Sequence, residues 1–214
     1  MFITKTTTTG KRHITLLLFC VFFFINLNAQ INKYYSALII QHDGTQIECF
    51  AKYPSMLNSK IIKFKTDQNS KTFTMKSAEI KTVRYFLKDN KTIEKEFLGH
   101  ISSFDMNKNF APVWMDVLAQ GQVTLYSTKE ISKSSKGLHT FITYHYYCKR
   151  ENEKFATKIA YVSSRNNFLV HKIMANEYFA DTPDILEKIE NKVDGYSAKE
   201  IMAIIEEYNR IIEN

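Results

Sequence analysis

The spacing of apolar residues changes once along this chain, and the change limits the folds that it can adopt. From residue 34 to 162, short runs rich in β-branched and aromatic residues alternate with turn residues, whereas beyond residue 166 the apolar residues recur at helical spacing. Strands followed by helices are typical of an α+β fold. We therefore predict an antiparallel β-rich domain over residues 30–163, either a sheet or an open barrel of about eight strands, on which a helical segment over residues 164–214 packs.

The first hairpin gives the clearest local signal. Two β-rich runs, 34–40 and 46–53, lie on either side of Asp43-Gly44, and an Asp-Gly pair favours the tight turn of a β-hairpin. Alternate residues of the second run are apolar, so one of its faces should be buried. The other strands are predicted at 60–65, 71–75, 82–87, 91–98, 122–127, 138–149 and 154–162.

One stretch inside the β-rich region carries helix signals. Pro112 stands near the start of an apolar stretch and Gly121 stands just past its end, which are the places that Pro and Gly favour in helices. We predict a short helix near 112–119, with Trp114 as its packing residue.

Three helical pieces are predicted after the strands, at about 165–180, 183–191 and 198–213. Thr182 and Pro183 suit the N-cap and the first position of the second piece, and Ser197-Ala-Lys-Glu200 has the pattern of a capping box. The last piece carries one apolar stripe, which should cover a face of the β-rich domain. The stripe consists of Ile201, Ile204, Ile205, Tyr208, Ile211 and Ile212.

Residues 1–29 have the organisation of a signal peptide. A basic stretch without acidic residues precedes the apolar run 14–25, and a polar stretch ends at Ala29, after which we expect cleavage. The run is shorter than the ~20 residues of a membrane-spanning helix, so no stable transmembrane segment is expected after cleavage; an uncleaved anchor is the alternative. Cys20 lies within the run and is interpreted as part of it, not as a lipidated N-terminus. We expect an exported protein, in the periplasm, on the cell surface or secreted.

The charge of the chain limits its possible binding partners, and its cysteines allow one disulfide. Without residues 1–29 the chain has 26 basic and 22 acidic residues, and only five of the 29 basic residues of the full chain are Arg, the side chain best suited to phosphates and bases. A nucleic-acid partner is therefore not predicted, whereas weak affinity for anionic envelope polymers is compatible with the excess of Lys. Cys49 and Cys148 could form a disulfide in an oxidising compartment; two separate buried thiols are the alternative.

Motifs for common enzymes are absent from the sequence. It has no Gly-rich phosphate loop, no Cys-x-x-Cys, no His-Glu-x-x-His and no Gly-x-Ser-x-Gly, so we predict no cofactor, no metal site and no catalytic residue, and leave open whether the protein is an enzyme. His139 and His145 share a strand face but lie about 20 Å apart along it, too far to share a metal ion.

Two carboxylates support the one enzymatic alternative. Glu94 and Glu96 share a strand face about 6.6 Å apart, a separation at which a pair of carboxylates could flank a glycosidic bond in an envelope hydrolase. The simpler interpretation is a solvated face opposite Ile93 and Phe97.

The strand at 138–149 is the most aromatic and carries the predicted binding residues, Tyr144, Tyr146 and Tyr147. Tyrosine combines a flat apolar ring with a polar tip and is common on binding surfaces. We expect the face with Tyr144 and Tyr146 to look into the core, and the face with His145 and Tyr147 to lie under helices or border solvent. Together these features favour a non-enzymatic exported envelope protein that binds a polymer, peptide or protein partner.

The order of these features resembles a group of exported proteins of Gram-negative bacteria. The resemblance lies in the Asn28-Ala29-Gln30 end of the signal, the turn at Asp43-Gly44, the stretch 121–126, the stretch 178–183 and the Glu206-Glu-Tyr-Asn209 tail. It implies an N-terminal signal, a β-rich domain and a C-terminal helical tail. No activity is assigned to that group, so the resemblance implies location and architecture and no functional residues.

Overall fold

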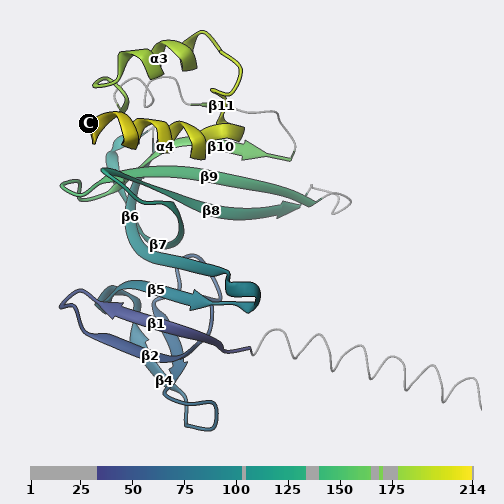
Figure 1. Ribbon diagram of the computed structural model, residues 1–214. Helices are drawn as coiled ribbons and strands as arrows, with labels where there is room; N and C mark the ends of the chain where they lie inside the picture. Colours follow the sequence, from purple (N-terminus) through teal and green to yellow (C-terminus); the bar gives the residue numbers. More distant parts are fainter. Residues whose placement is uncertain (1–32, 103–104, 134–139, 165–168, 171–177, 214) are drawn as a thin grey trace, which may run out of the picture.

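One continuous sheet forms most of the molecule. The structure, a computed structural model, describes residues 33–102, 105–133, 140–164, 169–170 and 178–213 (Figure 1). Over these residues eleven strands follow the order β11-β10-β9-β8-β7-β6-β5-β1-β2-β3-β4. The β-rich α+β fold is confirmed, with more strands than the eight or so that the sequence predicts.

Five strands and two short 3-10 helices build what we call the N-terminal lobe (Figure 1, lower half). They are β1 (Tyr35–Gln41), β2 (Gln46–Ala51), β3 (Ile61–Lys65), β4 (Phe73–Lys76), η1 (Ser77–Glu79), β5 (Ile80–Phe86) and η2 (Lys88–Asn90). Both predicted hairpins form, β1 with β2 and β3 with β4, and Gly44 at the first turn has a φ of 87°, which glycine adopts without strain. The alternate apolar residues of β2 face the lobe's core, beside Ile39, Val83 and Tyr85.

The C-terminal lobe contains the longer strands and the helices (Figure 1, upper half). Its elements are β6 (Thr92–Ser102), β7 (Asp105–Ala119), β8 (Val123–Lys133), β9 (Thr140–Arg150), β10 (Ala156–Ser163), β11 (Leu169–Val170), α3 (Pro183–Glu190), η3 (Ala198–Glu200) and α4 (Ile201–Ile212). Strands β6 and β7 run from one lobe into the other and join them (Figure 1).

The predicted helix at 112–119 is wrong, because these residues belong to strand β7. Both faces of β7 are buried at its centre: Trp114 packs in the core of the N-terminal lobe, and Met115 on the opposite face packs in a separate cluster with Tyr126 and Tyr147. A strand buried on both faces reads as a continuous apolar run, which sequence cannot distinguish from a buried helix. Pro112 is tolerated because β7 bulges there, with two residues opposite the single Gly99.

A short parallel pairing closes part of the sheet into a barrel. Strands β6 to β10 pair in succession, and β10 returns to β6 through Ala156 opposite His100 and Thr157 opposite Ile101. Part of the continuous sheet therefore forms a closed five-stranded barrel, whereas we expected either a sheet or an open barrel. Its middle is filled by apolar and tyrosine side chains, namely Leu98, Val113, Met115, Val117, Tyr126, Tyr147 and Ala156.

The helices cover the outer face of β8, β9 and β10 (Figure 1). Thr182 is the N-cap of α3 and Pro183 is its first residue, as predicted. Ser197 instead caps η3, a single 3-10 turn ahead of α4, so the capping box does not start α4 directly. The stripe of α4 is buried from Ile201 to Tyr208, whereas Ile211 is 45% exposed.

Some expectations fall outside the described residues. The predicted signal peptide 1–29 does so entirely, and most of the predicted helix at 165–180 does so as well, although Leu169–Val170 within it forms strand β11 against β10. In the part of the chain that the structure describes, no helix has the length and apolar character needed to cross a membrane.

Candidate functional site

A ladder of tyrosine rings leads from the core of the N-terminal lobe to its surface. The rings of Tyr85 and Tyr53 lie 4.4 Å apart, and those of Tyr53 and Tyr35 lie 4.6 Å apart. Tyr85 is fully buried and donates a hydrogen bond of 2.9 Å to the carbonyl of Lys52, where β2 ends. Tyr53 and Tyr35 are only partly buried, so the outer end of the ladder reaches solvent.

Lysine ammonium groups lie over two rings of this ladder and over aromatic rings near it. Their ammonium groups lie over aromatic rings at 5.0 Å for Lys33 on Tyr35, 5.8 Å for Lys95 on Tyr53, and 5.4 Å for Lys60 on Phe97. Tyr34, next along the chain, has Lys52 at 4.9 Å and Lys65 at 5.2 Å from the centre of its ring. Such cation–π contacts hold long, mobile lysines near one position.

A surface hollow of about 690 Å³ opens beside Tyr53, the middle ring of the ladder. Its walls come from the end of β2, the following loop and the start of β3, and include Lys52, Tyr53, Ser55, Met56, Lys60 and Lys63. We call this the lysine hollow. Hydrogen bonds from the backbone N–H of Trp114 to the carbonyl of Leu57, and from the indole of Trp114 to the carbonyl of Ser59, fix its loop against β7.

The lysine hollow is electropositive at its wall and partly apolar at its rim. Among the described residues, neither Lys60 nor Lys63 forms an ion pair with a carboxylate, whereas Lys95 below the ladder is paired with Asp116. Met56 at the rim is 66% exposed. Burial raises the pKa of Tyr53, and Tyr35 and Asp116 add to the effect, so its hydroxyl stays neutral and can donate to an anion. This combination of ammonium groups, a ring face and a phenol suits an acidic chain.

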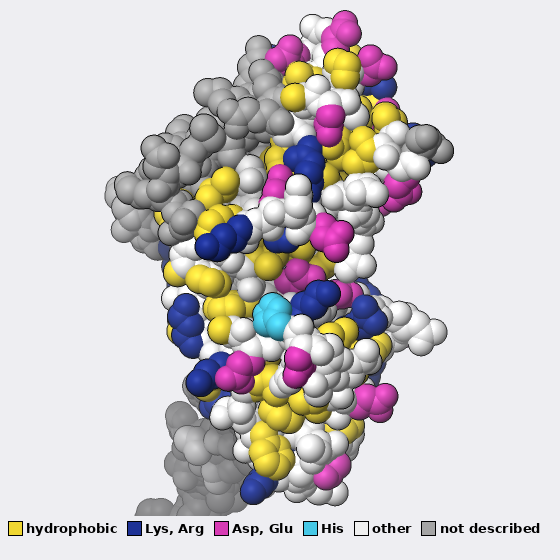
Figure 2. All heavy atoms as spheres, turned by 90° about the vertical axis from the view of Figure 1, so that its left-hand side faces the viewer, with side chains coloured by type: hydrophobic (Ala, Val, Ile, Leu, Met, Phe, Trp, Pro, Cys, Tyr) yellow, Lys and Arg dark blue, Asp and Glu magenta, His cyan; other side chains and the backbone are white. Residues whose placement is uncertain are grey.

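Charge on the described surface is grouped locally, as in the lysine hollow, and does not form one large patch of a single sign on the face seen in Figure 2. Figure 2 shows one face of the molecule, on which Lys and Arg side chains are interspersed with Asp and Glu and with hydrophobic side chains. The lysine excess is evident from the amino-acid sequence, but the grouping of the lysines is not. The recurrent pairing of Lys and Tyr at 33–35 and 52–53 was the signal that could have indicated it.

The three tyrosines predicted to bind do not share a surface. Tyr144 is 39% exposed, with the ammonium of Lys129 over its ring at 5.9 Å, whereas Tyr146 packs against the core under the helices and Tyr147 lies in the barrel. Tyr146 faces the core as expected. The face that carries Tyr147 and His145 lines the barrel instead of meeting helices, and the helices cover the Tyr146 face.

The two carboxylates of the hydrolase alternative point into neighbouring side chains. Glu94 accepts hydrogen bonds from the guanidinium of Arg84 at 3.2 Å and from Gln120 at 3.3 Å. Glu96 accepts one from the hydroxyl of Tyr126 at 2.9 Å, inside the barrel. Burial raises the pKa of Glu96, and this effect exceeds the opposing effect of that hydrogen bond. Neither carboxylate lies on the solvated face that the simpler interpretation expected.

Cys49 and Cys148 are free, buried thiols in separate core clusters, so the structure does not bring them together as a disulfide. Burial raises the pKa of Cys49 to about 11, which keeps this thiol protonated. His139 lies outside the described residues.

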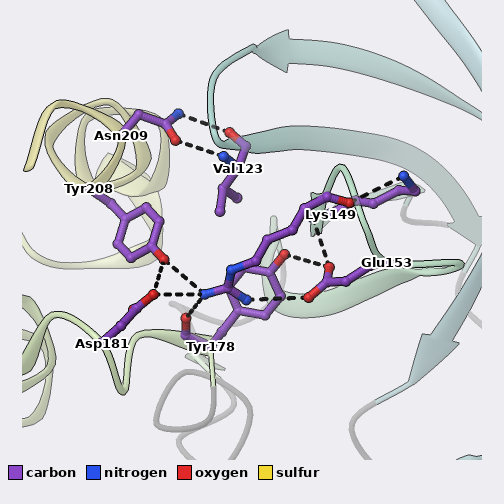
Figure 3. Close-up of polar contacts among 8 residues, drawn as sticks. Val123, Lys149, Glu153, Tyr178, Asp181, Tyr208 and Asn209 are labelled. Carbon is purple, nitrogen blue, oxygen red and sulfur yellow. Dashed lines mark hydrogen bonds and ion pairs between the residues drawn. The ribbon is translucent and has the colours of Figure 1, made fainter. Parts of the chain in front are cut away.

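A polar junction fixes the helices to the barrel (Figure 3). One Nη of Arg150 donates to the carbonyl of Tyr178 at 2.7 Å and to the hydroxyl of Tyr208 at 2.8 Å, and this hydroxyl donates to Asp181 at 2.7 Å. The other Nη donates to Glu153 at 3.3 Å. An open hollow of about 520 Å³ lies alongside. Because protein groups already use these donors, we assign Arg150 a structural role.

Asn209 makes a second tie beside this junction (Figure 3). Its side chain accepts a hydrogen bond from the backbone N–H of Val123 at 2.8 Å and donates one to the carbonyl of Val123 at 2.9 Å, much as a neighbouring strand would. A Cβ at Gly121 would come within 2.5 Å of the Asn209 side chain, so glycine is needed there.

Comparison of the chain with protein-family models, with curated proteins and with solved structures finds no match.

Proposed function

We propose that this chain is a non-enzymatic binding protein of the bacterial cell envelope and that it holds an acidic polymer at the lysine hollow. Export is inferred from the signal-like residues 1–29. The acidic polymer is inferred from the structure of the hollow and accords with the basic balance of the chain.

One observation carries the proposal: Lys52, Lys60 and Lys63 surround a hollow that Tyr53, the partly buried middle ring of the aromatic ladder, also borders. Ring faces can stack on flat parts of a polymer while ammonium groups meet its charges. Exposed ion pairs contribute up to about 1 kcal/mol each, so affinity would come from several contacts along an extended ligand. Such binding weakens as salt screens the charges.

Binding to a soluble acidic polymer tests the proposal. Polyglutamate and polygalacturonate would be titrated into the purified full protein by calorimetry at low and high salt, alongside a Lys60→Gln/Lys63→Gln variant. We expect the double substitution to weaken binding about tenfold, corresponding to about 1.4 kcal/mol. We also expect the difference to shrink at high salt.

The matched control removes two charges from the other lobe, with Lys192→Gln/Lys199→Gln. Both lysines are exposed and lie next to the helices. Equal weakening by the two variants would show attraction by net charge alone and contradict a site at the hollow. Absence of binding by the unaltered protein to either polymer would contradict the ligand class.

The location is tested separately, by measuring the intact mass of the protein from cell fractions. Cleavage after Ala29 and recovery in the periplasmic or secreted fraction are the expected results. An uncleaved mass in the membrane fraction would contradict the proposed export.

A further inference from the structure

Four titratable side chains meet at one end of the barrel, away from the lysine hollow. His100 lies on β6, His145 on β9, Lys158 on β10 and Glu130 on β8. The register places them together, since Lys158 is opposite Tyr147 and His100 is opposite Ala156, at the parallel pairing that closes the barrel. The charges of neighbours in this set affect the pKa values of His100, His145 and Lys158.

Aromatic rings hold both imidazoles in place. The ring of His100 stacks on Phe110 at 5.2 Å and meets the edge of Tyr147 at 5.4 Å. The Nε2 atom of His145 lies 3.1 Å from the carboxylate of Glu130, and its ring is 6.2 Å from that of Tyr161. Neither imidazole can therefore turn freely to find other partners.

Both histidines nevertheless have a buried Nδ1 atom without a hydrogen-bond partner. Lys158 is half-buried as well and, among the described residues, makes no ion pair, although Glu130 is near enough to affect its charge. Buried polar groups in folded proteins are nearly always satisfied by protein, water or a bound ion. The ammonium of Lys158 lies over the ring of Tyr161 at 5.6 Å and is not counted among such groups. Two unsatisfied imidazole nitrogens in one cluster with this ammonium indicate a place for a ligand.

We propose that His100, His145 and Lys158 form a binding site for a small anion of the carboxylate or phosphate class. Lys158 supplies a fixed positive charge, and His100 donates from Nδ1–H. His145 becomes a second donor when it takes up a proton, and the Glu130 carboxylate at its Nε2 stabilises that charged form. The ammonium of Lys158 repels metal ions, which is why the site suits an anion.

The pH dependence of binding follows from these neighbours. Burial lowers the pKa of both imidazoles, Lys158 adds to this effect, and the hydrogen bond with Glu130 opposes it for His145 alone. Two other described titratable side chains, Tyr147 and Tyr161, have rings beside those of His100 and His145. Burial raises the pKa of Tyr147, so its phenol stays neutral. A bound anion would favour the charged imidazole, so binding should strengthen as the pH falls.

The test uses sulfate, which is fully ionised at both pH values used, and acetate, which is mostly ionised at pH about 5.5. Each is titrated into the full protein at pH about 5.5 and about 7.5, with histidine ring signals followed by NMR. We expect saturable shifts of the His100 and His145 signals and roughly tenfold tighter binding at the lower pH. Lys158→Gln should weaken binding about tenfold at both pH values, and His145→Gln should remove most of the pH dependence.

Lys154→Gln is the matched control, because Lys154 is exposed just before β10. Saturation by sulfate alone supports a phosphate-type ligand, and saturation by acetate alone supports a carboxylate. Unchanged affinity in Lys158→Gln, or no saturable shift in the unaltered protein with either anion, would overturn the proposal. The titration of the unaltered protein needs no variant, so the test remains decisive even if a substitution disturbs folding.

Discussion

The two lobes bury different kinds of side chain. The core of the N-terminal lobe is aliphatic and aromatic, with Trp114 and Tyr85 at its centre, and its polar atoms are few and paired. The barrel of the C-terminal lobe has an apolar middle but carries Glu96 towards one end and the histidine and lysine cluster at the other. Charged groups are costly in a protein interior unless they are paired. The barrel thus gives up stability for polar groups in the way that ligand sites do, whereas the core of the N-terminal lobe favours stability and the proposed ligand site, the lysine hollow, lies on the surface of this lobe.

The largest effect expected tests the apolar core. Trp114 is 1% exposed, and its indole donates to the carbonyl of Ser59 and to the hydroxyl of Ser77. Trp114→Ala should lower the free energy of unfolding by about 3 to 5 kcal/mol. Urea unfolding measures this loss. A loss below about 1 kcal/mol would show that β7 does not organise the N-terminal core.

The next prediction tests whether the two lobes unfold independently, by substituting Asn209 in the C-terminal lobe. Asn209→Ala leaves the buried N–H and carbonyl of Val123 without partners, each costing about 1 to 3 kcal/mol. We expect a total loss near 3 kcal/mol and faster amide exchange in α4 and β8, with β1 and β2 unchanged. Asn152→Ala, at an exposed turn, serves as the control. Equal acceleration in both lobes would show that they unfold as one unit.

Substituting Arg150 should lower the free energy of unfolding somewhat less than substituting Asn209. Arg150→Met keeps much of the packing but removes the donors to Tyr178, Tyr208 and Glu153, for an expected loss of about 2 kcal/mol. Lys149→Met, at the neighbouring position, controls for loss of one charge. Thermal unfolding compares the two variants, and similar midpoints would contradict the structural role of the junction.

The smallest predicted effect is a gain in stability, produced by substituting Glu96. Because the pKa of Glu96 is raised in the fold, its protonated form contributes stability at low pH that is lost as the pH rises through this pKa. Glu96→Gln cannot ionise, so it should be more stable than the unaltered protein near neutral pH, by up to about 1 kcal/mol, with the advantage vanishing at acid pH. Denaturant unfolding at several pH values tests this. An advantage that grows as the pH falls would reverse the sign of the argument.

Sequence patterns predicted the N-terminal lobe better than the C-terminal lobe, for a physical reason. Its hairpins join strands that follow one another, and Asp43-Gly44 marks the first turn chemically. The barrel depends on the pairing of His100 with Ala156, which no local pattern encodes. It also depends on β7, where burial of both Trp114 and Met115 on opposite faces hides the alternation of a strand.

The candidate sites were harder to predict than the fold. Lys60 reaches Phe97, and Lys95 reaches Tyr53, only because distant strands pair, so the lysine hollow is not visible in the linear sequence. Tyr144, Tyr146 and Tyr147 are close in sequence, but closeness along a strand does not place side chains on one surface. Alternation along β9 sends Tyr146 and Tyr147 to opposite faces of the sheet.

Hydrogen exchange measured with and without polyglutamate tests the central claim most directly, because it locates the bound polymer without any substitution. We predict slower amide exchange over residues 52–63, around the lysine hollow, and no change over the helices α3 and α4. Slower exchange confined to residues 140–150, around Tyr144, would contradict the site at the hollow and favour the aromatic strand that the sequence first indicated.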